Sequence, residues 1–259
     1  MVRRGTLEKP FGGIVKCAQW IMREEGFAAF WKSNFTNCIR YFPTQALNFA
    51  FKGKVKAAFK GKKTDPDWKK FAQNIASGGV AGTLSLTFVY SLDMARTKLA
   101  NDLKGKGGTR EYSGLIDVYK KTMATDGVAG LYRGFNISAV GIFVYRGFYF
   151  GLYDTIIPML GDDVNFGIKF ATGYAVTVVA GIMSYPIDTI RRRMMMTSGG
   201  SKELMYKGSL DCAAQTIKNE GFMALMKGAG ANILRGVAGA GVLAGFDELK
   251  KFYIKQQYG

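Results

Sequence analysis

Three arginines lie inside otherwise apolar segments of the sequence: Arg40 in 35–59, Arg146 in 135–158 and Arg235 in 229–251. A charged side chain in an apolar helix is costly unless it faces protein or a water-filled cavity. Guanidinium groups bind phosphate through several hydrogen bonds at once, so two or three of them around one cavity suit a polyphosphate. The alternative is that each arginine caps a helix or forms a salt bridge between helices.

Another apolar segment of the sequence ends in a proline, an acid and a run of basic residues. The stretch Ser184–Met196 reads SYPIDTIRRRMMM, and no charged residue lies between Lys169 and Asp188. Pro186 removes a helical hydrogen bond and kinks the axis, while Asp188 and Arg191, three residues apart, share a helix face. The pattern predicts a kinked helix end that carries an ion pair. The alternative is a soluble helix with a solvated basic end.

The sequence repeats with a period of about a hundred residues. An acid-glycine pair occurs at Glu25-Gly26, Asp126-Gly127 and Glu220-Gly221, and another glycine stands thirteen residues before each of those glycines, at Gly13, Gly114 and Gly208. The period is too long for a solenoid, so it predicts three larger pseudo-symmetric units. Each unit reads as a short amphipathic helix followed by an apolar helix.

Equivalent positions of the three units carry two of the arginines. Fourteen residues beyond the glycine of each acid-glycine pair stand Arg40, Gly141 and Arg235, which should lie at one depth around the pseudo-threefold axis. Arg146 follows five residues after Gly141. Gly141 leaves room for a flat ring, and Tyr145, on the same helix face, can stack on that ring. The register predicts a polyphosphate site beside a pocket for a flat ring.

Two uncharged runs, 71–92 and 170–187, are 22 and 18 residues long. Because about 20 apolar residues cross a hydrocarbon core of ~30 Å, we expect an all-α membrane protein. Gly78 and Gly82 form a GxxxG motif, which permits close contact between helices.

The composition narrows the classes of function. The formal net charge is +17 and there is no histidine, which excludes histidine-based acid–base chemistry and histidine metal sites. The sequence contains no GxxxxGK[ST] loop, which is the phosphate-binding motif of many NTP-hydrolysing enzymes. Eight lysines from Lys52 to Lys70 raise a nucleic-acid binder as an alternative, but no nucleic-acid motif is present. We expect neither an enzyme, nor a metal site, nor a nucleic-acid partner.

Several stretches resemble the mitochondrial carrier family, and the resemblance covers essentially the whole chain. Arg191–Met196, RRRMMM, and Arg40–Phe51, RYFPTQALNFAF, are similar to the ADP/ATP carriers of that family. The resemblance implies a multi-pass protein of the mitochondrial inner membrane with the mitochondrial-carrier fold, in which three pseudo-symmetric repeats each add a short matrix helix to two transmembrane helices. It implies antiport of ADP and ATP by alternating access, no cofactor, and cardiolipin as a bound lipid.

The resemblance also implies a role for each candidate residue. The phosphates would be held by Arg40 and Arg235 with Arg146 nearby, and the adenine pocket would contain Gly141, Ile142, Tyr145 and Ser184. The matrix-side motifs would use Asp93, Arg96, Pro186, Asp188 and Arg191, beside the signature residues Arg191, Arg192, Arg193, Met194, Met195 and Met196. The opposite gate would use Asp154, Asp247 and Lys250. Cardiolipin would bind at the starts of the short helices, where free N–H groups attract phosphate, at Gly13, Gly114 and Gly208.

The chain departs from the family pattern at several places. In unit two, Ser91 replaces the motif proline, although the acid and base of the predicted ion pair, Asp93 and Arg96, are retained. Ile157 replaces the base of an opposite-gate pair. The motif acid precedes the acid-glycine pair by 32 or 33 residues in units three and two, and the same offset from Glu25 falls before residue 1.

We therefore expect five of the usual six transmembrane helices, with an incomplete first repeat at 1–60, a second at 71–160 and a third at 165–255. A polar cavity wall exposed to lipid is costly, so a partner chain or complex should cover the place of the first helix. Two hypotheses stay open, because function lies in the site and not in the fold. One is an ADP/ATP exchanger whose first helix comes from elsewhere. The other is a non-transporting structural or accessory subunit of a larger respiratory or ATP-synthase complex.

Overall fold

The computed structural model describes residues 12–59, 66–102, 110–159, 166–198 and 206–237, and every regular element in these ranges is a helix. In chain order the helices are α1 (Ile14–Glu24), η2 (Phe27–Trp31), α2 (Asn34–Ala58), α3 (Asp67–Ala100), α4 (Leu115–Leu131), α5 (Phe135–Met159), α6 (Phe166–Met196), α7 (Ser209–Glu220) and η3 (Phe222–Met226). A further helical segment covers 229–237, at the end of the described residues. The predicted all-α fold is confirmed.

Three helices in the described part of the chain are long and apolar enough to cross a membrane. They are Trp68–Ala100 in α3, Phe135–Tyr153 in α5 and Phe170–Met196 in α6. The two uncharged runs of the sequence lie inside α3 and α6. Helix α2 is 25 residues long, but Arg40 and several lysines make its composition less apolar.

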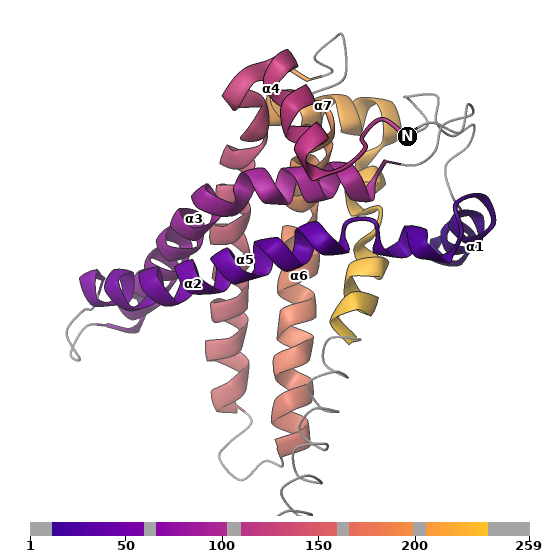
Figure 1. The fold of residues 1–259 in the computed structure, drawn as a ribbon. Coiled ribbons are helices and arrows are strands. Elements are labelled where there is room, and N and C mark those ends of the chain that lie inside the picture. The colour runs from indigo at the N-terminus through magenta and orange to yellow at the C-terminus, as the bar shows by residue number, and fades with distance from the viewer. Residues whose placement is uncertain (1–11, 60–65, 103–109, 160–165, 199–205, 238–259) are drawn as a thin grey trace, which may run out of the picture.

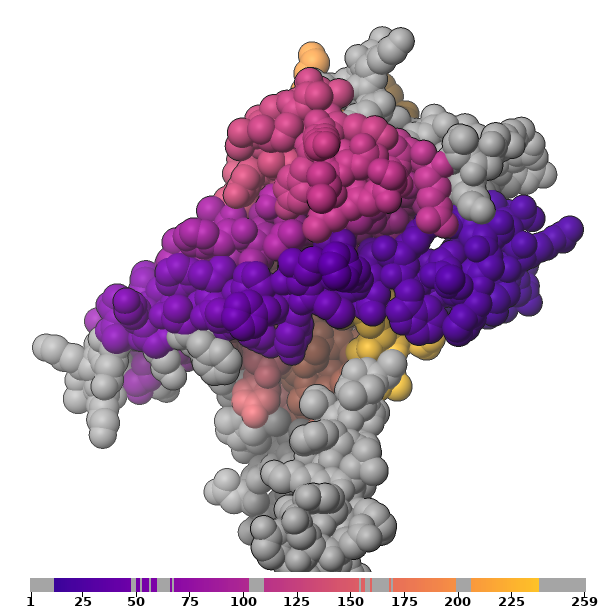
Figure 2. Space-filling model, viewed as in Figure 1, coloured from indigo at the N-terminus to yellow at the C-terminus, as the bar shows by residue number. Residues whose placement is uncertain are grey.

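Helix α2 nevertheless exposes large apolar side chains. It crosses the front of the molecule in Figure 2, and Phe35 and Phe42 are 72% and 80% exposed. Neighbouring exposed aromatic side chains of this size form the kind of patch that a soluble monomer rarely shows to water. The face therefore suits hydrocarbon better than water.

The long helices pack in a connected series that surrounds the predicted site. Helix α2 lies along α3, α3 also packs on α5, and α5 runs beside α6 (Figure 1). The short helices α4 and α7 lie at the same end of the molecule, at the top of Figure 1. The motif-bearing ends of α3 and α6 thus lead into the short helices.

Glycines on α3 let α5 approach closely, as the GxxxG motif predicted. A Cβ built on Gly82 would lie 3.1 Å from Ile142 Cγ2, and one on Gly78 would lie 3.4 Å from Arg146 Nη1. The tightest position is Gly79, where a Cβ would lie 2.2 Å from Phe143 Cε1. Phe143 therefore rests almost directly on the α3 backbone.

We expect Gly79→Val to lower the apparent melting temperature by roughly 2–10 °C, because overpacking a tight helix contact costs about 1–3 kcal/mol. Thermal unfolding of the detergent-purified protein measures this. The control is Gly173→Ala on α6, where an added Cβ meets no atom within 4 Å. Equal shifts for the two variants would contradict the close α3–α5 packing.

In the first two units, the base that stands six residues after the glycine of the acid-glycine pair ties its unit to the next one. Lys32 donates to the backbone carbonyl of Asp102, just beyond the end of α3. The equivalent Arg133 donates to Thr197 Oγ1 (3.0 Å) and to the carbonyl of Tyr206, both beyond the end of α6. These bonds hold the start of α2 against α3 and the start of α5 against α6, so they position the two motifs relative to their neighbours.

Two aspartates cap the short helices. Asp117 accepts a hydrogen bond from the Ser113 backbone N–H (3.0 Å) at the start of α4, and Asp211 accepts one from the Lys207 backbone N–H (2.8 Å) at the start of α7. These backbone hydrogen bonds lower the pKa of both carboxyl groups below the ordinary value. A lowered pKa gives stability that is present above the unfolded-state pKa, about 4, and is lost as pH falls through the folded-state pKa.

At pH 7 the variant Asp211→Asn should therefore melt at a lower temperature than the parent chain, and this difference should shrink as pH falls below about 4. The reason is that the parent carboxyl then becomes neutral, like the amide. Melting curves from about pH 7 to pH 3 measure the effect. Glu24→Gln, at an exposed pair on α1, is the matched control and should follow the parent. A deficit that stays constant with pH would rule out the carboxylate charge as its source.

Candidate functional site

A cavity of about 740 Å³ lies between α2, α3, α5, α6 and the segment 229–237. It brings together all seven residues predicted for the phosphate and ring sites: Arg40, Gly141, Ile142, Tyr145, Arg146, Ser184 and Arg235. Its wall also contains Asp93, Arg96, Asp188, Arg191 and Arg192. Among the described residues, six arginines and two aspartates thus line one cavity. Such an excess of guanidinium groups favours a multiply charged anion.

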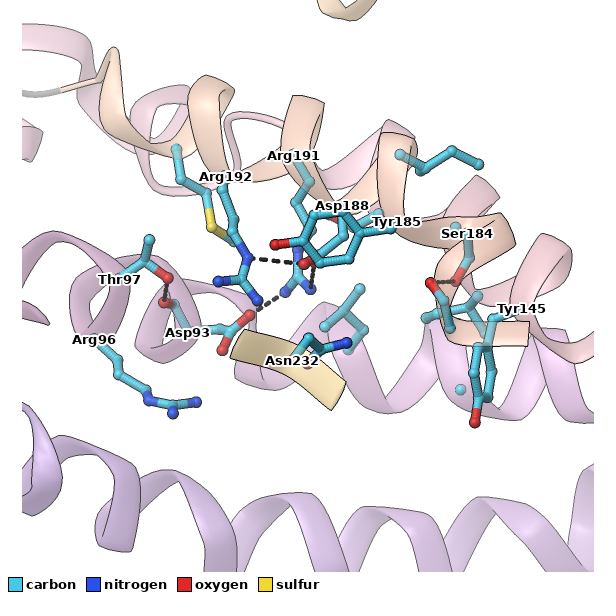
Figure 3. A pocket seen from close by; sticks show the side chains of 18 of the residues that line it. Asp93, Arg96, Thr97, Tyr145, Ser184, Tyr185, Asp188, Arg191, Arg192 and Asn232 are labelled. Atoms are coloured by element: carbon cyan, nitrogen blue, oxygen red, sulfur yellow. Dashed lines mark hydrogen bonds and ion pairs between the residues drawn. The ribbon is translucent and has the colours of Figure 1, made fainter. Parts of the chain in front are cut away.

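Asp93 of α3 lies beside Arg191 of α6 at one side of the cavity (Figure 3). Its carboxylate accepts a hydrogen bond from Arg191 of α6, and Arg40 Nη1 of α2 lies 3.8 Å from its Oδ1. The three side chains are between 14% and 23% exposed, so water screens them only in part. Among the described residues, no hydrogen bond or ion pair joins Asp93 to Arg96, the pair that the sequence predicted for the motif of unit two. Arg191 reaches Asp93 from the neighbouring helix instead.

In the motif of unit three, the acid Asp188 pairs with the base Arg191 of the same helix, as predicted. Asp188 Oδ1 lies 3.8 Å from Arg191 Nη1, and Asp188 Oδ2 accepts a hydrogen bond of 2.8 Å from Arg192 Nε. Arg193 binds Glu220 of α7 through two hydrogen bonds of 2.6 and 2.8 Å. The arginine run therefore divides: Arg191 and Arg192 line the cavity, whereas Arg193 anchors a short helix.

The remaining predicted residues lie away from the cavity, with one exception. Met195 is at the cavity wall but otherwise buried, Met194 is buried, Met196 is partly buried, and Pro186 lies in the interior of α6. The N-cap residues of α1, α4 and α7 are Gly13, Gly114 and Gly208, at the helix starts that the sequence predicted. Outside the described residues lie Asp247, Lys250 and the side chain of Asp154.

Two asparagines orient arginines of the cavity. Arg40 Nη2 donates to Asn37 Oδ1 (3.4 Å), and Arg235 Nε and Nη2 donate to Asn232 Oδ1 (3.3 and 3.0 Å). The sequence analysis missed both asparagines, although each stands three residues before its arginine at equivalent repeat positions. Each amide restrains a long guanidinium side chain, which reduces the entropy lost when an anion binds.

A second side of the cavity lies apart from the ion pairs, with Arg146 close to Tyr145. Tyr145 and Ser184 lie together there, away from the ion pairs (Figure 3). The Ser184 hydroxyl donates to the Ala180 carbonyl (2.9 Å) of its own helix. A Cβ added to Gly141 would come within 3.1 Å of Ile187 Cγ2, so glycine permits α5 and α6 to approach at this point. A flat ring can stack on Tyr145 at this side of the cavity.

The profile of the mitochondrial carrier protein family matches residues 1–63, 67–164 and 162–257 of the chain. The chain belongs to the mitochondrial carrier family. An ADP,ATP carrier protein of Chlamydomonas reinhardtii is 57% identical over 265 residues, which cover all of this chain and 85% of the relative. A mitochondrial ADP,ATP carrier protein of Solanum tuberosum is also 57% identical, over all of this chain and 68% of the relative. The mitochondrial ADP,ATP carrier protein 2 of Arabidopsis thaliana is 57% identical over 266 residues and 69% of its length.

Membership of this family confirms the predicted fold and the multi-pass location in the mitochondrial inner membrane. That the chain catalyses no reaction stays a prediction. The relatives are named as carriers, and they give no support to the hypothesis of a structural or accessory subunit. The partner chain or complex, the repeat boundaries and the role of each cavity residue stay predictions.

Proposed function

We propose that this chain exchanges ADP and ATP across the mitochondrial inner membrane. The observation that carries the proposal is the cavity with six arginines and two aspartates, whose side near Tyr145 lies apart from the ion pairs. ADP and ATP are polyphosphates attached to a flat ring, so their charge and shape match both sides of this cavity. The names of the relatives, ADP,ATP carrier proteins, agree with this substrate class.

The positions of the residues in the cavity support different binding roles for its two sides. Arg40 and Arg235, each restrained by an asparagine, would hold the phosphates from two sides, with Arg146 close by. Adenine would lie in the pocket of Gly141, Ile142, Tyr145 and Ser184. The ion pair between Asp93 and Arg191 joins α3 to α6 at the ends of these helices that lead into the short helices, and we infer that it is the matrix-side gate of the cavity. Alternating access then requires this pair to open, because a substrate enters and leaves by opposite sides.

The test is uptake of radiolabelled ADP by liposomes that contain the purified chain. If the chain exchanges nucleotides, uptake of ADP should depend on ATP inside the liposomes. Liposomes that contain the chain but no internal nucleotide should take up ADP no faster than protein-free liposomes. A labelled nucleoside without phosphates is the matched control and should not enter, because it offers the arginines no charge. Uptake of ADP at the protein-free rate would overturn the proposal.

We also propose that cardiolipin binds at the starts of the short helices. The N-cap residues Gly13, Gly114 and Gly208 supply no side-chain acceptor to the helix, so backbone N–H groups near these glycines are available to a lipid phosphate. Added cardiolipin should raise the apparent melting temperature more than added phosphatidylcholine does. Equal shifts for the two lipids would contradict this assignment.

A further inference from the structure

One aromatic ring lies directly against the ion pair between Asp93 and Arg191. The guanidinium carbon of Arg191 is 5.7 Å from the centre of the Tyr90 ring, and Tyr90 is completely buried. Tyr90 precedes Asp93 by three residues on α3, so the two side chains share one helix face. A guanidinium within about 6 Å of an aromatic face is attracted by the quadrupole of the ring, and the attraction grows where water is excluded.

The ring of Tyr90 is held in a fixed orientation. Its hydroxyl donates to the backbone carbonyl of Arg133 (2.8 Å) just before α5. The ring stacks on Tyr132, with centroids 5.9 Å apart, and meets Phe135 edge-on at 5.4 Å. These partners come from the segment that opens α5, so the start of α5 sets the position of the ring against Arg191.

Arg191 benefits from this contact because its own hydrogen bonding is incomplete. Its Nε is buried and has no hydrogen-bond partner within the described ranges. Its acceptor Asp93 is also approached by Arg40, at 3.8 Å. Two guanidinium groups beside one carboxylate repel each other and compete for it. An aromatic face adds favourable electrostatic potential for Arg191 without adding another charged group.

We propose that Tyr90 is a positioning residue of the matrix-side ion pair, whose ring holds the Arg191 guanidinium on Asp93. The inference rests on the proposed function only for the role of the ion pair in transport. The contact between ring and guanidinium can be tested on the purified chain without nucleotide, so the two proposals fail independently.

The test is a double-mutant cycle on apparent melting temperature, with the parent chain, Tyr90→Leu, Arg191→Gln and the double variant. Loss of packing around Tyr90→Leu occurs in both backgrounds and cancels in the cycle. We expect the double variant to melt about 2–6 °C higher than the sum of the two single shifts predicts, because the ring has no guanidinium to hold once Arg191 is replaced.

Two matched cycles separate this effect from packing. Tyr90→Phe keeps the ring and loses only the hydroxyl, so its coupling to Arg191→Gln should be smaller than that of Tyr90→Leu. Phe135→Leu removes a ring that touches Tyr90 and keeps the Tyr90 ring itself, so its coupling to Arg191→Gln should be smaller than that of Tyr90→Leu. Should Tyr90→Leu fail to fold, Tyr90→Met replaces it in the same cycle.

Additive shifts for Tyr90→Leu and Arg191→Gln, or equal coupling for Phe135→Leu, would overturn the inference and leave Tyr90 as a packing residue. If the coupling is found but ADP exchange fails, the inference about Tyr90 stands and the proposed function falls. If ADP exchange is found without this coupling, the proposed function stands and the inference about Tyr90 falls.

Discussion

Replacing Arg40 or Arg235 with alanine should lower the affinity of the chain for ADP by about 10- to 100-fold. Each guanidinium lines the cavity and is held by an asparagine, so its hydrogen bonds to phosphate need little rearrangement. A hydrogen bond to a charged group is worth about 1.5–3 kcal/mol, which converts to this range of affinity. Equilibrium binding of labelled ADP, together with the concentration dependence of ADP uptake, measures the change.

The matched control for these two variants is Arg23→Ala. Arg23 lies on α1, and its side chain is 87% exposed, so the substitution removes the same charge without touching the cavity. This variant should bind and transport ADP like the parent chain. If Arg40→Ala and Arg235→Ala bind ADP as tightly as Arg23→Ala, the phosphate-site assignment is wrong.

The second large effect is expected for Asp93→Asn. Asp93 is the acceptor shared by Arg191 and Arg40, so its loss leaves two guanidinium groups close together without their carboxylate. The pair is partly exposed, so its loss should cost less than the ~3–5 kcal/mol of a buried pair and more than the <1 kcal/mol typical of a surface pair. A cost of about 1–3 kcal/mol lowers the apparent melting temperature by roughly 3–10 °C.

Asp93→Asn should also reduce ADP/ATP exchange, because a change of about 1–3 kcal/mol shifts the balance between the states open to the two sides by about 5- to 150-fold. Melting curves and initial rates of exchange measure the two effects on one preparation. Glu24→Gln removes a carboxylate from an exposed pair on α1 and should change neither. The account of Asp93 is contradicted if Asp93→Asn melts and transports like Glu24→Gln.

The repeat pattern made the cavity predictable from the sequence. Arg40, Gly141 and Arg235 occupy equivalent positions in three units, and equivalent positions of a pseudo-symmetric fold lie at one depth. The uncharged runs gave the existence and type of α3 and α6, since few alternatives bury such long apolar stretches. Local spacing also predicted the Asp188–Arg191 pair, because both residues lie on one helix.

Contacts between helices were harder to predict. The second motif contains an acid and a base three residues apart, yet Asp93 binds Arg191 from another helix and Arg96 lines the cavity. Local spacing describes one helix face, whereas the choice of partner depends on how closely two helices approach and on which side chains point between them. The contact between Tyr90 and Arg191 could not be predicted for the same reason, since these residues lie on different helices and are 101 residues apart in the sequence.

The central claim is that the arginine-lined cavity recognises adenine nucleotides through their phosphates. Binding of labelled ADP to the purified chain, with unlabelled ATP, ADP and adenosine as competitors, tests it most directly. The account predicts saturable binding that ATP and ADP displace at similar concentrations, while adenosine needs at least about 100-fold more because it offers the guanidinium groups no phosphate. Absence of saturable ADP binding, or displacement by adenosine as readily as by ADP, would contradict the account.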